Sequence, residues 1–157
     1  MPAVIFVAGI GLALFALAFV TKRRFGVLGL ALAAGVLIST NWAAMLTPFL
    51  TSHGLTIEFI PLSVFVQASL ILLPALLLLM SGPTYNGGPL RILGALAFTI
   101  LAVTCLLQPL AEVLQLDGPS KVAYLWLSTQ QNIVIVIGLS LAVVDLLFAR
   151  SKHKGRH

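Results

Sequence analysis

Asp145 is the side chain in this sequence most able to carry chemistry, because it is an acidic residue within a long apolar run. An ionisable group inside a membrane-spanning helix is costly to bury, so it commonly pairs with a cation or serves transport. Asp145 lies about one turn from the end of its run, at the depth of Arg91 and the Lys22–Arg24 block. Two interpretations stay open: a structural ion pair, above all with Arg91, or a transport or regulatory role. A pair predicts non-additive effects of Asp145→Ala and Arg91→Ala in a double-mutant cycle.

Several uncharged polar side chains also fall within the apolar runs and could line an aqueous path. In membranes such side chains more often form hydrogen bonds between helices, worth about 0.6 kcal/mol each. No run alternates polar and apolar residues strongly enough to predict a wide pore. The candidates for a polar path or for interhelical bonds are Gln67, Asn41, Thr99, Thr104 and Gln108.

The residue types that enzymes and metal sites need are scarce. His53 lies in a predicted loop, and His153 and His157 lie in the C-terminal tail, so no predicted span holds a histidine. This pattern does not support a Ser–His pair, a two-histidine metal site or a histidine proton relay within the membrane. The single Cys105 excludes an intramolecular disulfide and a CxxC motif. We expect no enzymatic activity, no metal and no cofactor.

The elements that position these residues must be membrane helices. Of 157 residues, 60% are hydrophobic and 8% are charged, and the mean hydropathy is +1.12. A soluble domain is about 25% charged, so this chain has too little polar surface for a water-soluble globule. A span needs about 20 apolar residues, and we predict an all-α polytopic membrane bundle with five spans. One domain, residues 1–149, holds spans at about 2–20, 26–46, 59–80, 92–108 and 132–149, and a basic tail covers 150–157.

Prolines divide the apolar runs. Pro48 and Pro109 are expected to end the second and fourth runs, because proline lacks the N–H that a helix interior needs. Pro74 lies in the interior of the third run and predicts a kinked helix. After Pro109, residues 110–116 predict a short amphipathic helix, and residues 121–131 predict a segment at the membrane interface.

Small residues recur four positions apart in two runs. Such spacing lets two helix backbones approach closely in lipid. Whether these faces pack within one chain or between chains stays open at this stage. The pairs are Gly29/Ala33, Ala31/Gly35 and Gly138/Ala142.

The basic residues predict the orientation of the bundle. Lys and Arg favour the cytoplasmic side of short loops. With five alternating spans and the N-terminus outside, Lys121 alone of nine basic residues lies outside. This predicts a cytoplasmic C-terminus in a multi-pass protein of the plasma (inner) membrane. The inner cations are Lys22, Arg23, Arg24, Arg91, Arg150, Lys152, Lys154 and Arg156.

The basic tail and the cations beside it predict contact with lipid. Each cation near an anionic membrane surface contributes about 1 kcal/mol of attraction, so we expect anionic lipid at the cytoplasmic face. No aromatic platform accompanies the tail, and we expect no nucleic-acid partner.

Two stretches resemble the colicin V production protein family of small bacterial membrane proteins. One is the basic turn leading into a small-residue-rich helix, Lys22-Arg-Arg-Phe-Gly-Val-Leu-Gly29, and the other is Arg91-Ile-Leu-Gly94 at the start of a later helix. This chain departs from the family in lacking an acidic residue in its first span and in adding a fifth span. The resemblance implies an inner-membrane protein without enzymatic activity, linked to export of a small toxin or to envelope homeostasis.

These observations predict a small, non-enzymatic integral membrane protein that acts in envelope maintenance or as a secretion accessory. Its expected partners are the lipid bilayer and, through helix–helix contacts, a second copy of the chain or other membrane proteins. The alternative is an oligomeric transporter or channel subunit with a polar path near Asp145 and Gln67. Flux through the reconstituted protein separates the two hypotheses.

Overall fold

The computed structural model describes residues 2–55, 60–81, 88–113 and 119–151 of the chain. They form five α-helices, which confirms the predicted all-α class. Four helices contain a stretch long and apolar enough to cross a membrane, while the apolar stretch of the first, Ile5–Thr21, is shorter. The helices are α1 (Pro2–Thr21), α2 (Phe25–Ser52), α3 (Leu62–Ser81), α4 (Gly88–Val113) and α5 (Pro119–Ser151).

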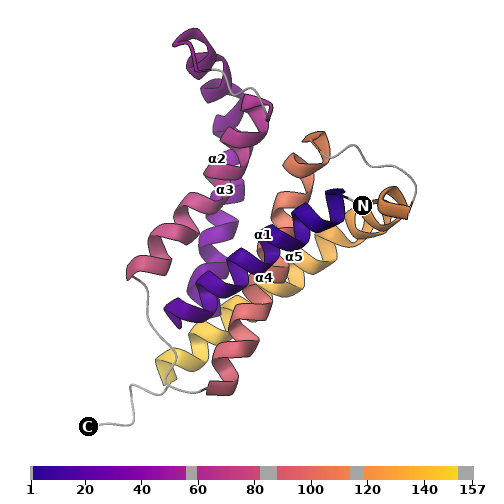
Figure 1. The fold of residues 1–157 in the computed structure, drawn as a ribbon. Coiled ribbons are helices and arrows are strands. Elements are labelled where there is room, and N and C mark those ends of the chain that lie inside the picture. The colour runs from indigo at the N-terminus through magenta and orange to yellow at the C-terminus, as the bar shows by residue number, and fades with distance from the viewer. Residues whose placement is uncertain (1, 56–59, 82–87, 114–118, 152–157) are drawn as a thin grey trace.

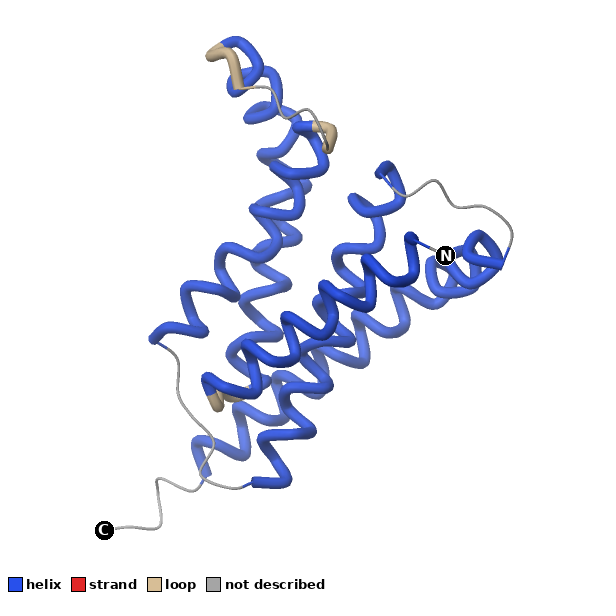
Figure 2. The backbone as a smooth tube through the Cα atoms, in the orientation of Figure 1, coloured by secondary structure: helices blue, strands red, loops and turns tan. Residues whose placement is uncertain are grey.

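Successive helices run in opposite directions (Figure 1). The last turns of α1, α3 and α5 therefore lie at the same end of the bundle as the first turns of α2 and α4. We call this end the basic end, because it carries Lys22, Arg23, Arg24 and Arg91. Toward the opposite end, the hairpin of α2 and α3 diverges from the group formed by α1, α4 and α5 (Figure 2).

The core lies where α2 and α4 meet the other helices. Phe98 and Leu101 of α4 and Leu28 and Leu32 of α2 are the largest side chains that are fully buried. α4 is the most enclosed of the four long apolar helices, whereas in α5 almost no residue of the apolar stretch is fully buried. Outward apolar side chains on a helix of this length are typical of a surface that faces lipid.

Glycines allow the closest helix contacts. A Cβ atom on Gly29 would lie 2.8 Å from Cβ of Ala142 in α5, and one on Gly138 would lie 2.9 Å from Cδ1 of Leu101 in α4. Gly35 packs with similar closeness on the backbone of Ile71 in α3. Gly29, Gly35 and Gly138 therefore pack within one chain, which is one of the two arrangements that the sequence leaves open.

Several helices extend beyond the predicted boundaries. α2 continues through Pro48 and α4 continues through Pro109, so neither proline ends its helix. Membrane helices tolerate an interior proline because neighbouring groups satisfy the freed carbonyl. Residues 121–131 belong to α5 and do not form a separate interfacial segment. Pro74 lies inside α3 as expected, and its kink stays a prediction.

Two predicted segments lie partly or largely outside the described residues. Of the amphipathic helix expected at 110–116, the structure describes residues 110–113 as the end of α4. Of the basic tail, it describes residues 150 and 151 as the end of α5, while Lys152 and Lys154 lie outside the described part.

Candidate functional site

Asp145 binds the first turn of α2. Its Oδ2 atom accepts a hydrogen bond of 2.9 Å from the backbone N–H of Gly26. The first N–H groups of a helix have no acceptor within the helix, and together they form the positive end of its dipole. Arg24, the residue before α2, provides no side-chain cap. The carboxylate of Asp145, from the far end of the chain, therefore acts as the cap of α2.

Glycine at position 26 makes this contact possible. A Cβ atom there would lie 3.0 Å from Oδ2 of Asp145 and 2.8 Å from Cγ of Leu146. Both distances are shorter than ordinary van der Waals contact, so a larger residue would push α5 away from α2. The Gly26–Asp145 contact depends on both residues.

Arg91 binds the last turn of α1. Its Nε atom donates a hydrogen bond of 2.7 Å to the carbonyl of Phe19, and its guanidinium carbon lies 3.8 Å from the centre of the Phe19 ring. A cation at a helix C-terminus is favourable, and stacking on an aromatic face adds to it. The predicted ion pair between Asp145 and Arg91 is not among the contacts of the described residues. The two side chains serve different helices, because equal depth in the membrane does not place residues side by side around a bundle.

Arg23 binds the last turn of α3. Its Nε donates to the carbonyl of Leu79 at 2.8 Å, and its Nη2 donates to the carbonyl of Met80 at 2.6 Å. The planar fork of the guanidinium suits two neighbouring carbonyls at the negative end of a helix dipole.

The basic end therefore joins helix termini through charged side chains. Arginines lie on the C-termini of α1 and α3, and an aspartate lies on the N-terminus of α2. Each sign matches the partial charge of the terminus that it contacts. The turn between α1 and α2 is tight, since Lys22 adopts a left-handed φ of 56° and remains exposed.

No hydrogen bond among the described residues joins the uncharged polar candidates to one another. Gln67 is half-buried on α3, Gln108 is exposed on α4, and Asn41 donates to Leu37 O of its own helix at 2.7 Å. The hydroxyls of Thr99 and Thr104 also bond to carbonyls of their own helix. These three bonds stay within one helix, so they support neither the predicted bonds between helices nor an aqueous path.

Among the described residues, Gln131 is an uncharged polar side chain that does bond to another helix, and it was not one of the candidates predicted from the sequence. Its Nε2 donates to the carbonyl of Thr104 at 3.2 Å, which links α5 to α4. The signal for it was a polar amide one residue before the predicted start of the fifth span. It was missed because 121–131 was expected to form a separate segment.

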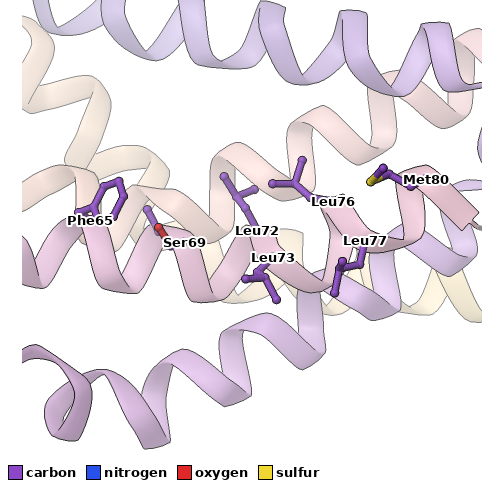
Figure 3. A pocket seen from close by; sticks show the side chains of 8 residues that line it. Phe65, Ser69, Leu72, Leu73, Leu76, Leu77 and Met80 are labelled. Atoms are coloured by element: carbon purple, nitrogen blue, oxygen red, sulfur yellow. The ribbon is translucent and has the colours of Figure 1, made fainter. Parts of the chain in front are cut away.

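Three grooves in the described residues have almost wholly apolar walls. The first, about 480 Å³, follows the outer face of α3, where Figure 3 shows Phe65, Ser69, Leu72, Leu76 and Met80 along the helix. The second, about 220 Å³, lies between α2, α4 and α5, and the third, about 520 Å³, lies between α2 and α3. Their walls suit hydrocarbon and offer few groups for polar chemistry. Within the part of the chain described, no three His, Cys, Asp or Glu side chains gather as metal ligands.

Comparison of this chain with models of known families, with curated proteins and with solved structures finds no match. The resemblance to the colicin V production family therefore stays a prediction from two short stretches.

The capping contacts predict independent effects at Asp145 and Arg91. Arg91→Gln should lower the free energy of unfolding by about 1–2 kcal/mol, because it removes both the helix-end charge and the ring contact. Since Asp145 contacts a different helix, a cycle with Asp145→Ala should be additive to within about 0.5 kcal/mol. Denaturant unfolding in detergent micelles measures both quantities.

Lys121→Gln is the control for this cycle, because Lys121 is an exposed cation near the start of α5. It should change stability by less than about 0.5 kcal/mol. A coupling above about 1 kcal/mol between Asp145 and Arg91 would favour the ion pair first predicted from the sequence.

Proposed function

We propose that this chain is a non-enzymatic integral protein of the plasma (inner) membrane that acts through contacts with other membrane helices. Its setting would be envelope maintenance or accessory work in export, as the resemblance to colicin V production proteins implies. The carrying observation is the hydrogen bond between Asp145 and the N–H of Gly26. Because its carboxylate is held at the N-terminus of α2, Asp145 is better explained by a structural role than by transport.

The proposal includes five spans with the N-terminus outside and the C-terminus inside. The opposite directions of successive helices support it (Figure 1). The gathering of Lys22, Arg23, Arg24 and Arg91 at one end of the bundle supports it too. The α1 helix, whose apolar stretch is shorter than those of the other four, packs into the bundle through Leu14 and Ala18. This packing supports counting α1 as one of the five spans. In a Cys105→Ala background, an impermeant maleimide should label Lys121→Cys on intact cells and spare Lys22→Cys. The reverse pattern would overturn the orientation.

Flux through the purified protein tests the proposed function against the transporter or channel alternative. Protein in liposomes should pass ions and small solutes no faster than protein-free liposomes, because the grooves are apolar and Asp145 contacts a helix end. Liposomes with an added ionophore control for detection. Flux that Asp145→Asn abolishes would refute the proposal and establish the alternative.

A further inference from the structure

The third groove described above lies between α2 and α3 and reaches the basic end. We call it the α2–α3 groove. On α2 its wall includes Val27 in the first turn and Ala34 two turns later, a rise of about 10 Å. On α3 its wall includes Pro74 and Leu78, and Leu146 of α5 closes it beside the first turn of α2.

The cationic turn between α1 and α2 lies at the inner end of this groove. Arg24 directly precedes α2, which forms one wall. Arg23 holds the turn to the other wall through its bonds to the carbonyls of Leu79 and Met80, which follow Leu78 in α3. Lys22 is exposed and Arg24 is half-exposed, so positive charge faces the surroundings where the two walls meet the turn.

Small side chains account for the hollow. Ala31 and Ala34 face the groove from α2, and Pro74 faces it from α3. Ala34 is exposed, so a longer side chain there would enter the groove without displacing a buried neighbour.

We propose that the α2–α3 groove binds an acyl chain of an anionic phospholipid whose phosphate lies against Lys22 and Arg24. An apolar groove takes up hydrocarbon, and a cation at its end selects lipids by head-group charge. Basic pockets between membrane helices bind anionic head groups, and guanidinium groups suit phosphate oxygens. The site requires that the chain lie in a bilayer, and it does not rest on the proposed role in export.

Lipid titration of the full-length protein in detergent, followed by native mass spectrometry, tests the head-group part of the proposal. Dioleoyl phosphatidylglycerol should bind about 25-fold more tightly than dioleoyl phosphatidylcholine, because two cations each add about fivefold. Lys22→Gln should remove about fivefold of this preference, and Lys22→Gln with Arg24→Gln should remove all of it. Lys121→Gln at the opposite end should leave it unchanged.

A groove-filling variant tests the acyl-chain part. Ala34→Leu should weaken binding of both lipids by about tenfold, since the added side chain occupies the path of the acyl chain. Ala44→Leu is the matched control, because Ala44 is an exposed alanine of the same helix outside the groove. Circular dichroism checks that each variant keeps its helical content. If the double variant does not fold, the single variant Lys22→Gln still tests the head-group preference.

Three results would overturn the proposal. The first is equal affinity for the two lipids, and the second is an equal loss of preference in Lys22→Gln and Lys121→Gln. The third is unchanged lipid binding in Ala34→Leu, which would place the lipid on the surface outside the groove.

Discussion

Replacing Gly35 with alanine should lower the free energy of unfolding by about 2–3 kcal/mol, among the largest losses from a single methyl group in this chain. The added Cβ would lie 2.8 Å from the carbonyl carbon and 2.9 Å from the Cα of Ile71, and closer still to the carbonyl oxygen. These are backbone atoms of a neighbouring helix, so they cannot rotate away as the tip of a side chain can. α2 and α3 would have to separate along the face that joins them. Denaturant unfolding in mixed micelles measures the loss.

Gly9→Ala is the matched control for this prediction. Gly9 also lies inside a helix, but a Cβ atom there would meet nothing within 4 Å. Alanine has a higher helix propensity than glycine, so this variant should be as stable as the wild-type protein or slightly more stable. Equal stability of Gly35→Ala and the wild-type protein would show that the close α2–α3 contact does not form.

Replacing Asp145 with alanine should lower the free energy of unfolding by about 2 kcal/mol. The substitution removes the acceptor of the Gly26 N–H and leaves the positive end of α2 without a counter-charge. Asp145→Asn keeps an oxygen that can accept the hydrogen bond but loses the charge, so it should cost about half as much. The same unfolding measurement in detergent, on all three proteins, gives the order of stabilities.

Ser140→Ala is the control on the same helix. Ser140 is exposed, and its hydroxyl donates to the carbonyl of Val136 within α5. Its loss should change stability by less than about 0.5 kcal/mol. If Asp145→Ala were equally mild, the carboxylate would not be an important cap of α2.

The helical class, and the end of the bundle at which the charged residues lie, could be predicted from the sequence. Apolar runs of about 20 residues in a chain with few charges leave little alternative to helices that cross a membrane. The same runs indicate how far Asp145 and Arg91 lie from their ends. They do not indicate how each helix is rotated or which helices are neighbours. Arg91 therefore contacts Phe19 of α1, and Asp145 contacts Gly26 of α2, in place of the expected pair.

Helix boundaries and backbone partners were harder to predict. Pro48 and Pro109 were expected to end helices by a rule from soluble proteins, yet α2 and α4 continue past them. The acceptors of Arg23 and Arg91 are main-chain carbonyls, which every residue has and which no sequence motif marks. The small residues were the better signal, because Gly29 and Gly35 lie at close helix contacts.

Hydrogen exchange of the Gly26 amide tests the central claim, that the one acidic residue of the predicted spans holds the start of α2. This amide bonds to Asp145 across the bundle, so its protection reports the contact directly. In detergent, we expect Asp145→Ala to accelerate exchange at Gly26 by at least about tenfold and to leave exchange at Gly138, within α5, unchanged. Equal exchange at Gly26 in the wild-type and Asp145→Ala proteins would contradict it.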